Sequence, residues 1–155
     1  MIRVFSRANI ENWYREFPED TTPVISLNDI GYDSPVPDNH PRALRLWFDD
    51  VSPFLVKHDL HHQYYKECEK QRSLVLFDDC MAELVSEFLY GLLMDSEKDL
   101  LVHCHAGVSR SVAVAVYAHL LYGYTLGDLQ GVNYEDCRMN SYVFGKLLKY
   151  QKGGF

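Results

Sequence analysis

The chain has 155 residues, of which 47% are hydrophobic and 14% aromatic, and this composition predicts one globular domain spanning residues 1–155 rather than a disordered chain. The formal net charge of -7 argues against a nucleic-acid partner, because binding to a phosphate backbone normally requires a basic surface. No apolar run approaches the roughly 20 residues of a membrane span, and the N-terminal stretch lacks the apolar core of a signal peptide. Since the four cysteines also show no paired spacing, we expect a reduced, cytoplasmic protein. We also expect it to be a monomer.

The first half of the chain carries patterns of both strands and helices. A helix is expected over Arg7 to Glu16, with Ser6 as its N-cap and apolar side chains at helical spacing. Three short apolar runs predict buried strands: residues 2–5, 23–27 and 43–48. A proline-rich loop separates the second run from the third, and residues 51–72 are polar and irregular, which is typical of a loop.

The second half repeats the alternation. Leu100–His103 is an apolar run suited to a buried strand, and the residues from Ser111 to Leu121 suit a helix covered on all sides, with Gly123 just beyond its end. Three further helices are expected: about Cys80 to Met94 after a cap at Asp78 or Asp79, a short one from Thr125 or Asp128, and a last one capped by Asn140 or Ser141. Strands that alternate with helices in this way predict an α/β three-layer sandwich with a mainly parallel central sheet.

The link between residues 100–103 and the following helix concentrates the chemistry of the chain. Cys104 and Arg110 enclose five residues, among which Gly107 permits backbone angles that other residues resist. The helix that follows directs its N-terminal N–H groups toward the same hollow, and Arg110 can bind a tetrahedral oxyanion with two donors. A cysteine beside these positive groups favours the nucleophilic thiolate, to which Ser111 can donate a hydrogen bond.

The stretch His103-Cys104-His105-Ala106-Gly107-Val108-Ser109-Arg110-Ser111 resembles the signature loop of the cysteine-dependent protein tyrosine phosphatases, and most closely that of their dual-specificity branch. This resemblance implies a phosphatase fold and hydrolysis of phosphotyrosine, with phosphoserine and phosphothreonine as further substrates, in phosphorylated proteins. It also implies a phosphocysteine intermediate and no metal or other cofactor.

The resemblance assigns a role to each residue of the loop. Cys104 would be the nucleophile, Arg110 would clamp the phosphoryl group, and Ser111 would help the sulfur to leave. His103 would order the backbone beside the thiol. The remaining phosphoryl contacts would come from the backbone amides of His105, Ala106, Gly107, Val108 and Ser109.

An acid that protonates the leaving oxygen is also expected, and the pair Asp49-Asp50 follows the third predicted strand. In the phosphatases that the loop resembles, such an Asp lies shortly after a strand and tens of residues before the cysteine. We favour Asp50 over Asp49 because its register relative to the strand fits better. Without the cysteine loop, both residues would be read as simple strand terminators.

Other functions remain open from the sequence. The same loop could act on a phosphoinositide or an RNA 5′ end, although the residues between Cys104 and Arg110 contain no lysine. A catalytically weak module that binds phosphoproteins is a second alternative, and a redox protein that pairs Cys104 with Cys80 or Cys137 is a third. His58 and His62 have a spacing that could bind a metal, but we favour solvated loop histidines.

Overall fold

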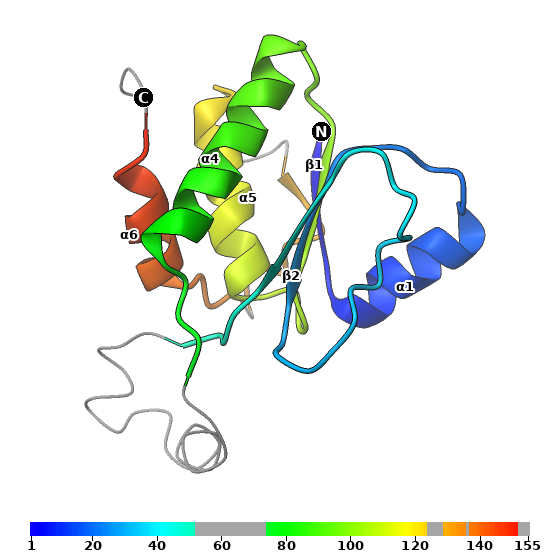
Figure 1. The fold of residues 1–155 in the computed structure, drawn as a ribbon, viewed down its shortest axis with the longest axis horizontal. Helices are drawn as coiled ribbons and strands as arrows, with labels where there is room; N and C mark the ends of the chain where they lie inside the picture. Colours follow the sequence, from blue (N-terminus) through cyan, green and yellow to red (C-terminus); the bar gives the residue numbers. More distant parts are fainter. Residues whose placement is uncertain (52–73, 124–128, 136, 152–155) are drawn as a thin grey trace.

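The computed structural model describes residues 1–51, 74–123, 129–135 and 137–151, and its centre is a five-stranded sheet in the order β3-β2-β4-β1-β5 (Figure 1). All four pairings between neighbouring strands are parallel. The strands are β1 (Ile2–Phe5), β2 (Val24–Asn28), β3 (Ala43–Trp47), β4 (Leu100–His103) and β5 (Leu129–Gln130). Because the strands are parallel, their carboxyl ends share one edge of the sheet, and the cysteine loop follows the end of β4 there.

Helices cover both faces of this sheet. Figure 1 shows α1 on one face and the other three helices together on the opposite face. The helices are α1 (Arg7–Glu16), α4 (Asp79–Met94), α5 (Arg110–Leu121) and α6 (Ser141–Leu148). The predicted α/β layers and parallel sheet are therefore confirmed.

Alternate residues of the strands supply two separate cores, as the period of two in a strand requires. Leu100 and Val102 face the large core that contains α4, α5 and α6, whereas Leu101 belongs to a smaller cluster with Ile10 and Tyr14 of α1. The polar residues of α1 lie outside both cores, so one side of that helix remains open to solvent.

Side-chain caps fix where three helices begin. Ser6, Asp78 and Asn140 each accept a hydrogen bond from a backbone N–H in the first turn of α1, α4 and α6, respectively. The alternative caps Asp79 and Ser141 are instead the first helical residues. Helix α5 begins at Arg110, one residue earlier than predicted, so this arginine belongs to the helix as well as to the loop.

The region before α6 differs from the prediction. Leu129 and Gln130 form the edge strand β5, which contradicts a helix starting at Asp128. The sequence signal was misleading because a two-residue edge strand carries no periodicity, and its pairing to β1 is a long-range contact. A helix start at Thr125 and the loop histidines His58, His61 and His62 lie outside the described residues. In the described part of the chain, no helix is long and apolar enough to cross a membrane.

Candidate active site

The loop after β4 is seated on the junction between β1 and α1. Gly107 has a φ of +75°, and a Cβ atom built there would lie 2.8 Å from the backbone nitrogen of Ser6. Any larger residue would therefore push the loop away from this junction. The backbone N–H of Arg7 also donates to the carbonyl of His105 at 2.9 Å, which fixes the first half of the loop.

Cys104 lies at the buried base of the loop, where 2% of the residue is exposed. Its Sγ is 2.9 Å from the Oγ of fully buried Ser111, in the first turn of α5, and it accepts a hydrogen bond from the Gly107 N–H at 3.3 Å. When the sulfur is ionised, both groups can donate to it, and such donors stabilise a thiolate relative to a thiol. The structure therefore brings Cys104 and Ser111 together as the sequence predicted.

Arg110 is buried below the loop and held by two acceptors. One terminal nitrogen donates to the carbonyl of Phe48 at 2.8 Å, and the other donates to Oδ1 of Asp29 at 2.7 Å. Burial lowers the pKa of Arg110, but negative charge at Cys104, Asp29 and Asp50 outweighs it, so the pKa is raised and the guanidinium remains charged. Its buried Nε has no hydrogen-bond partner among the described residues, so one donor remains available to an anion.

The two neighbouring carboxylates occupy different environments. Oδ1 of Asp50 accepts hydrogen bonds from the Ser109 hydroxyl at 2.7 Å and from the Asn140 amide at 2.9 Å, so it contacts the loop directly. Asp49 exchanges two hydrogen bonds with the backbone of Val75, which tie residue 75 to the end of β3. The structure thus places Asp50 at the loop and gives Asp49 a structural contact. Which of them transfers a proton remains a prediction.

His103 contacts the base of the loop through a buried polar network. Its Nε2 is 2.6 Å from the Oγ of Ser26, and its Nδ1 is 3.3 Å from the carbonyl of Cys104. Because a carbonyl only accepts, the proton belongs on Nδ1, and Ser26 donates to Nε2. Burial lowers the pKa of His103 to about 4, so the ring is neutral near pH 7. Asn28 and Ser34 also contact the Ser26 hydroxyl.

The exposed side of the loop carries His105, whose Nδ1 is 3.3 Å from Oδ2 of Asp29. Asp29 therefore contacts both the buried Arg110 and the exposed His105. Sequence reasoning missed Asp29 and Ser26, and it assigned Asn140 only a capping role. The available signal was the position of Ser26 and Asp29 at the carboxyl end of β2, beside the end of β4.

A metal site and a disulfide are the two remaining kinds of site that the sequence raised. The described residues contain no group of three His, Cys, Asp or Glu side chains that could hold a metal ion. Cys80, Cys104 and Cys137 are free thiols, with Cys80 exposed and Cys137 partly buried. The redox alternative from the sequence, in which Cys104 pairs with Cys80 or Cys137, therefore has no disulfide behind it among the described residues.

Comparisons with known proteins define the class of fold. No protein family model and no curated relative matches the chain. The human tyrosine phosphatase-like serine/threonine/tyrosine-interacting protein superposes with a TM-score of 0.56 at 17% identity, covering 95% of this chain and 88% of that one. The PTP-2 phosphatase of Cydia pomonella gives a TM-score of 0.49 at 20% identity, covering 95% and 83% of the two chains. The first likeness shows that this chain has a tyrosine phosphatase-like fold.

Proposed function

We propose that the protein is a phosphatase that hydrolyses phosphotyrosine, and also phosphoserine and phosphothreonine, in proteins. The observation that carries this proposal is a buried cysteine in the same loop as a buried arginine that has a hydrogen-bond donor left for a ligand. Two donors contact the sulfur of Cys104, and the buried Nε of Arg110 lacks a partner among the described residues. A phosphoryl group would bring oxygens to the arginine and phosphorus to the sulfur.

The first chemical step transfers the phosphoryl group to the protein. Arg110 and the amides of the loop bind the phosphoryl oxygens while the thiolate of Cys104 attacks phosphorus in line. A sulfur–phosphorus bond forms and the bond to the leaving oxygen breaks, with a proton passing from Asp50 to that oxygen. Hydrogen bonds from Ser109 and Asn140 to Oδ1 of Asp50 hold this carboxyl group at the loop.

The second step returns the protein to its starting state. Water attacks the phosphocysteine, and the carboxylate of Asp50 accepts a proton from this water. The sulfur–phosphorus bond breaks, and inorganic phosphate leaves. Ser111 lies 2.9 Å from the sulfur and stabilises the departing thiolate by donating its hydroxyl proton in a hydrogen bond.

A phosphoprotein-binding module is the second candidate. The name of the human structural neighbour describes a phosphatase-like, interacting protein, and the same anion cradle would capture a phosphorylated residue without turning it over. Action on a phosphoinositide or an RNA 5′ end is less well supported. His105 is the only basic side chain between Cys104 and Arg110, and the chain has a net charge of -7.

Hydrolysis of p-nitrophenyl phosphate by the purified protein without added metal tests the proposal. We expect the wild type to turn over, Cys104→Ser to be inactive and Asp50→Ala to be strongly slowed, because each removes one of the two reacting groups. An inert wild type that still binds vanadate would establish the binding module instead. Retention of activity by Cys104→Ser would overturn the assignment of the nucleophile.

Three further properties belong to the same proposal: the protein acts in the cytoplasm, as a monomer and without a metal. Unchanged turnover after dialysis against a chelator would support the last of these. Size-exclusion chromatography coupled to light scattering checks the monomer, and a second species that carries the activity would contradict it.

A further inference from the structure

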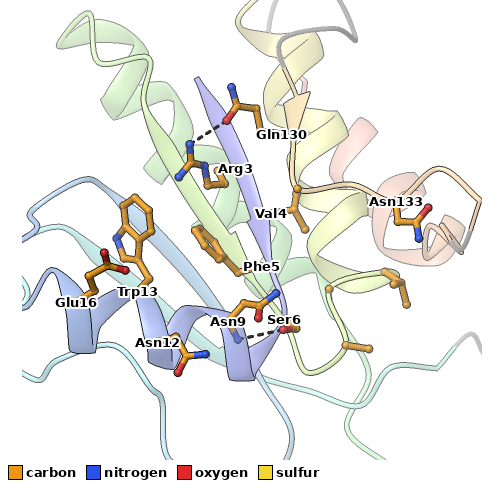
Figure 2. Close-up of a pocket in the computed structure, with 14 residues that line it drawn as sticks. Arg3, Val4, Phe5, Ser6, Asn9, Asn12, Trp13, Glu16, Gln130 and Asn133 are labelled. Atoms are coloured by element: carbon orange, nitrogen blue, oxygen red, sulfur yellow. Dashed lines mark hydrogen bonds between the residues drawn. The ribbon is translucent and has the colours of Figure 1, made fainter.

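A groove lies beside the cysteine loop, on the face of the sheet that α1 covers. Figure 2 shows it between α1 and β5, with β1 as its floor. Its volume is about 500 Å³, within the range of about 300–1,000 Å³ that is usual for ligand sites. Phe5 and Trp13 supply aromatic surface, and residues Ala106 to Val108 of the cysteine loop form part of its lining.

The walls of this α1–β5 groove are rich in carboxamides. Asn9 and Asn12 come from α1, and Gln130 and Asn133 come from β5 and the residues after it. A carboxamide can both donate and accept hydrogen bonds, and so can the peptide unit of a polypeptide. The chemistry of the walls therefore matches an uncharged polypeptide segment.

The charges of the groove argue against a second phosphate site. Arg3 donates to Oε1 of Gln130 at 3.0 Å, and its guanidinium lies 5.1 Å from the centre of the Trp13 ring. Both partners are neutral, so Arg3 keeps its positive charge while these contacts hold it between the two walls. Glu16 adds a negative charge to the lining, which would repel an anion.

The wall formed by β5 approaches the floor closely. Gly131 has a φ of +79°, and a Cβ atom built there would lie 2.1 Å from the carbonyl oxygen of Val4. Only glycine fits this close approach, so the chain after β5 can lie directly against Val4 and bound the groove on that side. The same need for glycine applies at Gly107, where the cysteine loop meets Phe5 and Ser6 at the carboxyl end of β1. These two close contacts therefore place one wall of the groove and the cysteine loop against the same strand, β1.

We propose that the α1–β5 groove binds the uncharged polypeptide segment next to the phosphorylated residue of a protein substrate. This inference rests on the proposed function, since the loop must hold the phosphorylated residue for the neighbouring segment to reach the groove. The shared lining at Ala106 to Val108 supplies that continuity. Affinity for a phosphopeptide then comes from two adjoining sites, the anion cradle and the groove.

Binding of a non-hydrolysable peptide tests the groove independently of catalysis. The probe is a fluorescent peptide with a central tyrosine phosphonate flanked by serine, glycine and asparagine, and the reference is the phosphonate amino acid alone. We expect the wild type to bind the peptide about tenfold more tightly, which corresponds to one or two net hydrogen bonds and their contacts. Equal affinity for the two would overturn the proposal.

Substitutions of exposed residues that line the groove test whether the additional affinity for the peptide comes from the groove. Asn12→Trp fills the groove from α1, so we expect its affinity for the peptide to fall about tenfold while its affinity for the amino acid is unchanged. Asn9→Ala removes one carboxamide without adding bulk, and we expect a smaller loss from it. Glu87→Trp adds the same bulk to an exposed position of α4 on the opposite face, as a matched control that should leave both affinities unchanged.

The outcomes separate the groove from the catalytic proposal. Unchanged peptide affinity in both Asn9→Ala and Asn12→Trp would overturn the groove, as would an equal loss for peptide and amino acid, because either result removes its selective contribution. In the proposed mechanism, hydrolysis of p-nitrophenyl phosphate depends on the loop and Asp50 but not on the groove, so its absence in the wild type would overturn the phosphatase while leaving the binding result intact. Circular dichroism of each variant confirms that it is folded.

Discussion

The base of the cysteine loop and its rim are built from different interactions. At the base, His103, Cys104 and Ser111 are at most 2% exposed, and hydrogen bonds from serine hydroxyls and a backbone N–H fix the histidine ring and the sulfur. At the rim, Asp29 and Asp50 are only partly buried. Asp29 contacts the Arg110 guanidinium, and Asp50 contacts a hydroxyl and a carboxamide. The base therefore fixes the positions of the sulfur and the histidine ring. The rim carries the carboxylates, including Asp50, which exchanges a proton in the proposed reaction.

This difference teaches where each kind of substitution should act. Hydrogen bonds in a buried region are costly to leave unmade, so changes at the base should lower stability as well as activity. Carboxylates near solvent are easier to replace, so changes at the rim should alter the reaction with less effect on folding. Arg110 joins the two regions, because its side chain is buried and contacts Asp29 at the rim.

The largest expected effect is at Arg110. Arg110→Lys keeps the charge but loses the planar set of donors, so we expect kcat/KM for p-nitrophenyl phosphate to fall on the order of 10³-fold. Arg45→Lys is the matched control, since Arg45 contacts the carbonyl of Pro37 rather than the loop, and it should leave the rate unchanged. Equal losses in the two variants would show that Arg110 acts only through folding.

Substitutions of the adjacent residues Asp50 and Asp49 should have different effects, the first on catalysis and the second on stability. Asp50→Asn removes the proposed proton donor, and we expect kcat to fall about 10²-fold or more with little change in melting temperature. Asp49→Asn weakens the contact with Val75, and we expect a loss of about 1–3 kcal/mol of stability with kcat largely retained. The measurements are steady-state kinetics and urea unfolding, and the reverse pattern would identify Asp49 as the acid.

Acidification tests the neutral state of His103. In the unfolded chain its pKa is about 6.5, and in the folded protein it is about 4, so the unfolded state binds the proton first as the pH falls. The contribution of His103 to the free energy of unfolding is therefore fully present above pH 6.5. It is lost as the pH falls from 6.5 to about 4, and the total loss is about 3 kcal/mol.

Urea unfolding across this pH range measures the loss. The slope of stability against pH should be shallower in His103→Asn than in the wild type, because both proteins share the same carboxylates. Parallel curves for the two proteins would mean that folding does not lower the pKa of His103.

The smallest effect is expected at Ser26, which contacts His103 from the far side of the base. Ser26→Ala leaves Nε2 of His103 without its donor, and we expect a loss of about 1–2 kcal/mol in urea unfolding. Nitrogen NMR shifts of the histidine ring should also report a weaker preference for the Nδ1-protonated form. Ser34→Ala is the control, because Ser34 contacts Ser26 and not the ring, and its loss should be smaller.

Much of the fold was predictable because its signals are local. Apolar runs located the first four strands, and the caps at Ser6, Asp78 and Asn140 marked helix starts to within a residue. The short strand β5 was missed because only its pairing with β1 defines it. The cysteine loop was recognisable because its residues are consecutive in the sequence.

The partners of the loop were harder to predict because they come from distant segments. Asp29 and Arg110 are 81 residues apart, and Asp50 and Asn140 are 90 apart, so no spacing rule joins them. The choice of Asp50 as the residue facing the loop depended on register after a strand, which is a local signal. The groove beside α1 was not foreseen, because its walls meet only in the folded sheet.

Asn140 links the start of α6 to the proposed acid. This one residue caps α6 through its side-chain oxygen, donates its backbone N–H to Ser109 and donates its side-chain N–H to Asp50. Fraying of the first turn of α6 would therefore remove one of the two side-chain hydrogen bonds that position Asp50, while leaving Cys104 and Arg110 in place. Molecules in that state would bind phosphate but turn over slowly, so the activity should decline on warming before the protein unfolds.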